Sequence, residues 1–256
     1  MIIRKSAGEL ELMRRSGAIL AETIARVVEA VGPGVSTLEL DQIAARMIAD
    51  AGAEPSFLGY GGGGGRIPFP AHICASINDE IVHGIPSAGR VLRDGDLVSL
   101  DFGAIWRDFH SDSAVTVFVG SPPDDDAKRL VEVTQEALDA AIAVVRPGGR
   151  LSDIGHAIEQ TADAHGLGIV REYGGHGIGR AMHEDPFIQN WGTAGRGPEL
   201  KPGLVVAIEP MLTLGADGTR VMPDGWTVRT IDGSLAAHFE HTVAVTDTGA
   251  EVFTAR

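Results

Sequence analysis

The order of apolar and turn-forming segments is similar in the two parts of this chain, and this repetition constrains the fold strongly. Each part begins with two segments whose apolar residues recur at helical spacing, separated by Pro33-Gly34 in the first part and by Pro147-Gly148 in the second. Glycine-rich stretches and short β-like runs follow. Two similar helical hairpins can arise by chance, whereas a duplication predicts two αα-ββ halves around a pseudo-twofold axis, with a site between them.

The element boundaries follow from capping and turn residues. Ser6 to Glu9 is a capping box, from which a helix runs to the break at Gly32-Pro33-Gly34. Three further helices are predicted over 37–51, 124–145 and 152–165. Strands are predicted over 72–77, 97–105, 113–119, 204–208, 227–231 and 239–245.

Composition excludes several classes of protein. Hydrophobic residues make up 44% of the 256 residues, which suffices for a sizeable core. No apolar stretch is long enough to cross a membrane, and the first residues lack the apolar segment of a secretory signal. The net charge of −14 argues against a broad nucleic-acid-binding surface. The single cysteine, Cys74, fits a reducing compartment, so we expect a cytoplasmic protein, and because nothing marks an interface we expect a monomer.

Two aspartates lie beside apolar runs near the middle of the chain. A tight hairpin with Trp106-Arg107 at its tip would place Asp101 and Asp112 opposite each other on one face, with Cβ atoms about 5 Å apart. Two buried carboxylates repel each other and are costly to desolvate, and divalent cations would relieve both costs. For these two residues alone, a solvated pair beside a turn is the alternative.

Three more residues extend this set. His176 has glycines on both sides, which leave room for a ligand to reach its imidazole. Glu209 closes an apolar run before Pro210, which keeps Glu209 extended, and Glu240 enters another apolar run. Four carboxylates and one imidazole form a hard oxygen and nitrogen set that suits a two-metal hydrolase. Cys74 is not needed as a ligand, because the set is complete without it.

Six stretches of the chain share a recognisable pattern: 78–86, 101–112, 175–186, 208–211, 224–228 and 239–242. Jointly they resemble the methionine aminopeptidases of the short, bacterial (type I) class, over nearly the whole chain from Leu12 to Thr248. The resemblance implies an α+β pita-bread fold, in which an antiparallel sheet is covered by helices. It further implies one catalytic domain over 1–256, with pseudo-symmetric halves of roughly 10–120 and 121–250.

The resemblance also implies a dinuclear metal centre. Its ligands would be Asp101, Asp112, His176, Glu209 and Glu240. Asp112 and Glu240 would bridge two divalent ions, Asp101 would hold one ion, and His176 with Glu209 would hold the other. Cobalt, manganese, iron and zinc all accept such a set.

The implied reaction removes the N-terminal methionine of nascent polypeptides when the second residue is small. Glu209 would accept a proton from the attacking water, and His183 would donate a hydrogen bond to the substrate carbonyl oxygen. His83 would contact the scissile amide. Either histidine in isolation would be interpreted as an ordinary surface or core residue. Nascent chains as substrates suggest contact with the ribosome near its exit tunnel, although no basic patch is recognisable.

A methionine pocket is implied for four residues: Tyr60, Cys74, Met182 and Trp226. Apolar surface with a soft sulfur fits a thioether side chain, and plain core packing is the alternative for Cys74 and Trp226. The chain departs from the family pattern at three places. The segment Gly61 to Gly65 is unusually long and rich in glycine, Met182 replaces a common aromatic residue, and His238 replaces a common glutamine.

Relatives on the same fold are alternatives. A prolidase or aminopeptidase P usually carries an extra amino-terminal domain, for which the residues before Asp101 leave no room. A type II enzyme would carry a helical insertion, for which the stretch from Glu209 to Glu240 is too short. A catalytically inactive binding protein, or a metal-free hydrolase similar to creatinase, would lack metal ligands, whereas all five are present here.

Overall fold

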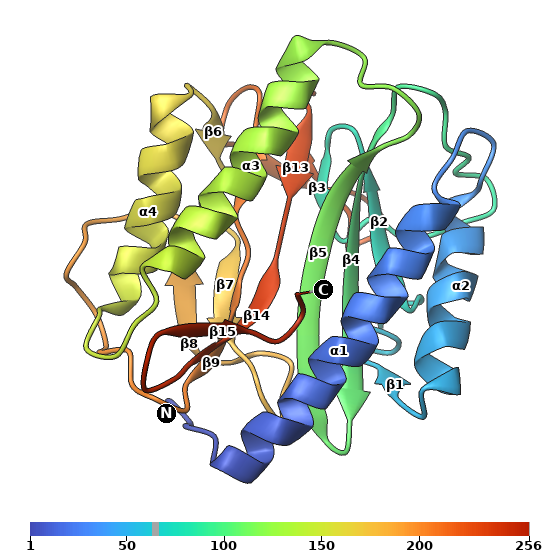
Figure 1. The fold of residues 1–256 in the computed structure, drawn as a ribbon. Coiled ribbons are helices and arrows are strands. Elements are labelled where there is room, and N and C mark those ends of the chain that lie inside the picture. Colours follow the sequence, from blue (N-terminus) through green and yellow to red (C-terminus); the bar gives the residue numbers. More distant parts are fainter. Residues whose placement is uncertain (63–66, 256) are drawn as a thin grey trace.

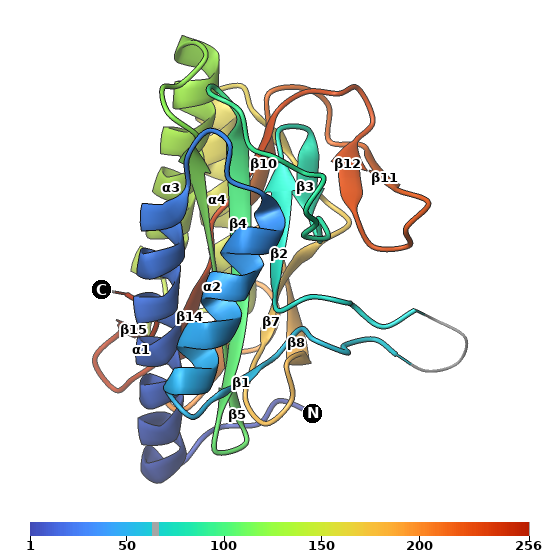
Figure 2. The ribbon, with the colours of Figure 1, turned by 90° about the vertical axis from the view of Figure 1, so that its right-hand side faces the viewer.

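The computed structural model describes residues 1–62 and 67–255. Its helices are α1 (Ala7–Ala30), α2 (Thr37–Asp50), α3 (Asp125–Ala143) and α4 (Leu151–Ala164). These confirm the predicted helices with boundaries that differ by one or two residues. Figure 2 shows the helices together on one side of the strands, with β3, β11 and β12 on the other. None of the helices in the described part of the chain has the length and apolar character that a membrane span requires.

The strands of the described chain form antiparallel sheets. One sheet contains β1 (Glu54–Pro55), β2 (Ile73–Ile77), β4 (Leu97–Trp106) and β5 (Phe109–Phe118). The largest contains β7 (Gly174–Gly177), β8 (Glu184–Gln189), β9 (Val205–Ile208), β14 (His241–Val245) and β15 (Ala250–Val252). Two smaller sheets contain β6 (Gly168–Ile169), β10 (Met211–Thr213) and β13 (Ala236–His238), and β3 (Glu80–Val82), β11 (Thr219–Val221) and β12 (Val228–Thr230).

Side-chain caps explain where the helices begin. Ser6 Oγ accepts a hydrogen bond from the backbone of Glu9, whose carboxylate accepts one from the backbone of Ser6. Ser36 and Glu39 form the same capping box at α2. Asp124 caps α3 by accepting from the backbone of Ala127. Each cap satisfies backbone N–H groups that have no partner within the helix.

The two helix pairs lie over different strands (Figure 1), and each pair covers an apolar core of its own. Residues of α1 and α2 pack on β2 and β4 in a cluster that includes Leu20, Leu40, Ile73 and Leu100. Residues of α3 and α4 pack on β9 and β14 in a cluster that includes Leu130, Ile154, Val206 and Val243. One helix pair per strand layer agrees with the predicted αα-ββ order, while the division into halves of 10–120 and 121–250 stays a prediction.

The predicted register of the β4–β5 hairpin is wrong. Its turn is formed by Arg107 and Asp108, whose φ angles are 47° and 69°, and not by Trp106-Arg107. Asp101 therefore pairs with Ala114, and Asp112 pairs with Gly103, two residues after Asp101. Two-residue hairpin turns favour positive φ at both central residues, which is harder for a bulky tryptophan than for an aspartate. Because the partners shift by two residues, both aspartates still face the same side of the sheet.

The predicted strand over 239–245 is also wrong at its start. β13 ends at His238 and β14 begins at His241, and the two strands belong to different sheets. Glu240 lies between them, and its backbone N–H and carbonyl pair with Ala114 on β5 at 3.0 and 3.3 Å. This pairing joins the strand layer under α1 to the layer under α3 and places Glu240 at the junction.

Candidate metal centre and substrate pocket

All eleven residues predicted for metal binding, substrate binding or catalysis line one cavity of about 210 Å³. They are Tyr60, Cys74, His83, Asp101, Asp112, His176, Met182, His183, Glu209, Trp226 and Glu240. Phe57 and Phe69 complete the lining, and the sequence analysis missed both. Each lies in an irregular segment beside the glycine run, where no periodic pattern indicates which way a side chain points.

Strand pairing positions the five predicted ligands. Asp101 and Asp112 are held by the β4–β5 ladder. His176 lies on β7 opposite Ala207 of β9, and Glu209 follows directly after β9. Glu240 lies at the junction described above. The ladders bring donors from distant parts of the chain to one point, because strand pairing fixes which residues lie opposite each other and on which face.

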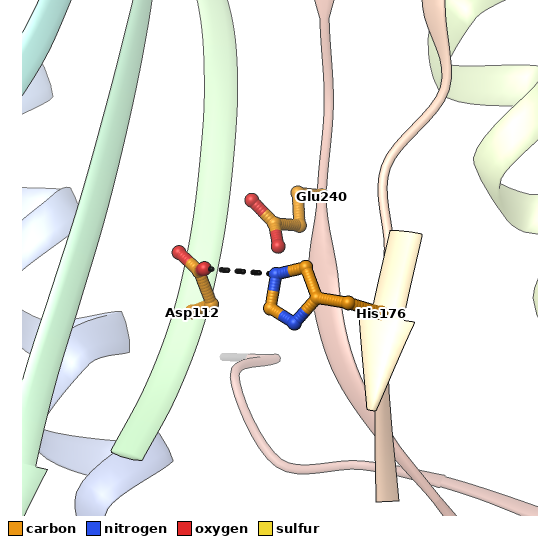
Figure 3. Close-up of side chains that lie close together, drawn as sticks. All are labelled: Asp112, His176 and Glu240. Carbon is orange, nitrogen blue, oxygen red and sulfur yellow. Dashed lines mark ion pairs between the residues drawn. The ribbon is translucent and has the colours of Figure 1, made fainter. Parts of the chain in front are cut away.

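Three of these ligands meet most closely (Figure 3). One donor atom from each of Asp112, His176 and Glu240 lies within 4.8 Å of the others. His176 Nε2 is 3.6 Å from Asp112 Oδ2 and 3.7 Å from Glu209 Oε1. His176 Nδ1 lies 2.9 Å from the carbonyl oxygen of Gly177, so this nitrogen donates a proton and Nε2 keeps its lone pair for a metal.

Several buried carboxylate oxygens lack hydrogen-bond partners among the described residues. They are Asp101 Oδ1, Asp112 Oδ1 and Glu240 Oε1. Burial raises the pKa of Asp112 to about 8, and burial together with neighbouring carboxylates raises the pKa of Asp101, Glu209 and Glu240 well above the ordinary range. Buried acceptors without donors are costly, and divalent cations would satisfy them. The donor set therefore fits a metal centre.

The two candidate catalytic histidines lie beside this centre. The His183 ring is 4.1 Å from the His176 ring between centroids, and its Nδ1 is 2.7 Å from Tyr60 Oη. When Tyr60 donates to Nδ1, the proton of His183 lies on Nε2 and is available to a substrate. Burial, and secondarily the nearby His183, lowers the pKa of His83 to about 4, so His83 is neutral at physiological pH.

Apolar side chains form the wall of the cavity. Cys74 and Met182 are each 4% exposed. The Trp226 ring packs edge-on against Phe69 and its Nε1 donates to the carbonyl of Ile67. A Cβ at Gly61 would lie 2.7 Å from the Trp226 ring, which explains one glycine of the Gly61 to Gly65 segment. Gly63 to Gly65 of this segment lie outside the described residues.

His238 also lies beside the candidate metal centre, although the sequence analysis noted it only as a departure from the family pattern. It is 2% exposed, and its Nε2 lies 3.8 Å from Glu209 Oε2 and 3.9 Å from Glu240 Oε2. Neither ring nitrogen has a hydrogen-bond partner among the described residues. Its position two residues before Glu240 in the sequence was the only available signal, and the strand break between them removes the alternation that would have made it decisive.

Comparisons with known proteins agree with this geometry. Residues 11–247 match the model of metallopeptidase family M24. Methionine aminopeptidase 1 of Mycobacterium tuberculosis is 52% identical to this chain, and the alignment covers 99% of this chain and 95% of the relative.

Solved structures show the same fold. The crystal structure of methionine aminopeptidase from Thermotoga maritima superposes with a TM-score of 0.96 and 40% identity, covering 100% of both chains. The prolidase from Pyrococcus furiosus superposes with a TM-score of 0.76 at 23% identity, covering 99% of this chain and 66% of that chain, which shows the fold alone. Methionine aminopeptidases and prolidases share the pita-bread fold, so the predicted fold class is confirmed. The chain belongs to metallopeptidase family M24.

Proposed function

We propose that this chain is a methionyl aminopeptidase, which hydrolyses the first peptide bond of nascent polypeptides that begin with methionine and have a small second residue. Relatives named methionine aminopeptidase along the whole chain support this activity. The observation that carries it is the cavity, which combines a cluster of metal donors with an apolar, sulfur-containing wall. An aminopeptidase for methionine needs both in one place.

The donor cluster would hold two divalent ions. Asp112 and Glu240 would bridge them, Asp101 would complete one coordination shell, and His176 with Glu209 the other. Bound divalent ions would lower the pKa of water and polarise the substrate carbonyl. These oxygen and nitrogen donors accept cobalt, manganese, iron or zinc.

Side chains of the cavity would carry out the remaining steps. Glu209, 14% exposed and 3.7 Å from His176 Nε2, would accept the proton of the attacking water. His183 would donate a hydrogen bond from Nε2 to the carbonyl oxygen as negative charge develops there. Neutral His83 would bind the scissile amide and assist the leaving nitrogen.

The wall of the cavity would select the substrate. The methionine side chain would lie among Tyr60, Cys74, Met182 and Trp226, in a cavity that Phe57 and Phe69 also line. An unbranched thioether fits such a surface, and a charged side chain would lose its hydration there without a partner. A small second residue would be required because the metal donors and His183 crowd the scissile bond.

Nascent chains as substrates would place the protein in the cytoplasm beside the ribosomal exit tunnel, and we propose that it acts there as a monomer. The net charge of −14 makes a broad contact with ribosomal RNA unfavourable, so the ribosome contact would be small. Co-sedimentation with translating ribosomes and analytical ultracentrifugation of the purified protein test these two statements.

Metal analysis combined with a peptide series tests the proposed activity. Protein loaded with a divalent ion should bind two ions per chain and release methionine from Met-Ala peptides. It should leave Lys-Ala and Ala-Pro peptides largely intact. Equal cleavage of Met-Ala and Lys-Ala would contradict a methionine pocket, and preferential cleavage of Ala-Pro would instead indicate a prolidase.

A further inference from the structure

A buried ion pair lies behind the segment that carries Met182 and His183. This segment, residues 178–183, connects β7 to β8. Lys5 Nζ is 2.7 Å from Glu184 Oε2, and the two side chains are only 3% and 8% exposed. Among the Lys and Arg ion pairs of the described residues, this is the one in which both side chains are less than a tenth exposed. Its position directly after His183 connects it with the candidate active site.

The backbone of the segment rests on this ion pair. Glu184 Oε1 accepts a hydrogen bond from the backbone N–H of Ala181 at 3.3 Å. A Cβ at Gly179 would lie 2.5 Å from both Glu184 Oε1 and Lys5 Cε, so the backbone of the segment passes directly against the pair. The carbonyl of Gly179 also accepts from the backbone of His110 on β5 at 2.8 Å. Glu184 therefore holds the segment through the Ala181 hydrogen bond and the contact with Gly179.

Lys5 is itself held firmly. Its backbone N–H donates to the carbonyl of Gly203 at 2.6 Å, which ties the start of the chain to the loop before β9. Its ammonium group lies 3.4 Å from the carbonyl of Ile3. The ion pair between the Met1 amine and Asp185 is exposed, so solvent screens it and it adds little. Arg180 Nη2 also lies 3.6 Å from Glu9 Oε1, but these side chains are 59% and 34% exposed. The buried connection between the N-terminal segment and residues 178–183 is therefore the one through Lys5 and Glu184.

We propose that Lys5 and Glu184 are positioning residues for His183. Their ion pair holds residues 178–183 so that the His183 imidazole stays over the cavity. Within the described residues, the hydrogen bond to Tyr60 is the only one made by the His183 ring, and Tyr60 is 40% exposed. The backbone under His183 must therefore supply much of its orientation. The inference rests on the proposed function, in which His183 binds the substrate carbonyl.

A double substitution tests the role of the pair. Lys5→Met with Glu184→Gln removes both charges, so that neither is left buried and unpaired. A displacement of about 1 Å in a catalytic group can cost about 10²-fold, and we expect kcat on a Met-Ala peptide to fall about tenfold or more. KM and the number of bound ions should change little. A kcat within about twofold of the native value would overturn the proposal.

A matched control removes another ion pair that tethers α1. Arg14 Nε is 2.6 Å from Glu251 Oε1 on β15, with both side chains more than a third exposed. Arg14→Met with Glu251→Gln should leave kcat nearly native. If this control lowers kcat as much as the Lys5 and Glu184 double variant, loosening of α1 explains the effect and the proposal is wrong.

Combination with His183→Ala separates positioning from general destabilisation. In the His183→Ala background, removal of the Lys5–Glu184 pair should lower kcat by less than about twofold, because the group it positions is gone. A further tenfold loss would overturn the proposal. If His183→Ala alone leaves activity native, the role of His183 in the proposed function is contradicted, and the inference falls with it.

Lys5→Arg serves if the double variant does not fold. It keeps a positive charge opposite Glu184, while the larger planar guanidinium changes how the pair fits against residues 178–183. The same comparison with and without His183→Ala applies, and additive losses again decide against positioning.

Discussion

The floor of the cavity, which carries the proposed metal ligands, and its rim are built in different ways. The floor consists of Asp101, Asp112, His176, Glu209 and Glu240, which lie on strands or immediately beside them. The rim consists of Tyr60, His183 and Trp226, which lie in connecting segments. Asp112, His176 and Glu240 are at most 4% exposed, whereas Tyr60 is 40% exposed.

This difference separates two kinds of positioning. Floor residues are held in place by the backbone ladders. The fold tolerates the mutual repulsion and the desolvation of their carboxylates, and bound cations would relieve both. Rim residues lie outside these ladders, and their side chains depend on individual contacts, such as the 2.7 Å hydrogen bond between Tyr60 and His183. Substitution in the floor should therefore change metal binding, and substitution in the rim should change turnover while metal stays bound.

The largest effect is expected from the floor. Asp112→Asn should lose at least one ion and lower activity by more than about 10³-fold, because an amide is a poor bridging ligand. This exceeds the roughly 10- to 100-fold loss typical of residues that only orient a ligand. Metal analysis and turnover measure both effects, and Asp126→Asn, at an exposed site on α3, is the control. Two bound ions with near-native turnover in Asp112→Asn would contradict the role of Asp112 as a metal ligand, and with it the distinction between floor and rim.

Next in size is the effect of His183→Ala in the rim. Loss of one donor to the developing oxyanion should lower turnover by about 10²–10³-fold, while metal content stays native. Atomic absorption measures the metal content and steady-state kinetics the turnover, both on the same preparation of the variant. Loss of metal together with activity would show that His183 belongs to the floor.

The stability of the metal-free protein should depend on pH through the floor. Burial raises the pKa of Asp112 to about 8 in the folded chain, whereas an unfolded aspartate titrates near about 3.9. Between about pH 6.5 and 8 the folded chain thus holds a proton that the unfolded chain has lost, so stability falls as pH rises. His83, with a pKa of about 4, titrates below this window.

One such group contributes about 2 kcal/mol across that window. Bound ions keep the carboxylates deprotonated, so the loaded protein should not show this loss, and metal should stabilise the chain more at the higher pH. Urea unfolding at both pH values, with and without metal, measures the difference. Equal free energies of unfolding of the metal-free protein at about pH 6.5 and 8 would contradict the raised pKa of Asp112.

The smallest effect is expected from Tyr60→Phe. The change removes one hydrogen bond to His183, worth about 0.5–1.5 kcal/mol, so turnover should fall about 2- to 10-fold with metal content and Tm unchanged. Tyr173→Phe makes the same chemical change beside His83, where no hydrogen bond of the hydroxyl is found in the described part of the chain. A loss of bound metal in Tyr60→Phe would show that rim and floor are not independent.

Much of the fold and floor could be predicted because local sequence encodes them. Capping boxes at Ser6 and Ser36 fix where helices begin, and the period of apolar residues fixes which face is buried. The donor types indicated the five residues of the floor, and the resemblance to the family implied the other six residues that line the cavity. The helix starts, the buried faces and the donor types depend on residues close together in the sequence.

Other features depend on contacts between distant segments, and only the tertiary structure decided them. The hairpin register required the turn conformation of Arg107-Asp108, and the break before His241 required the pairing of Glu240 with β5. The contact of Lys5 with Glu184 and the approach of His238 to Glu209 also join segments far apart in the chain. Residue type and periodicity indicate that a side chain will be buried, but its partner is determined by how the strand layers and loops pack together.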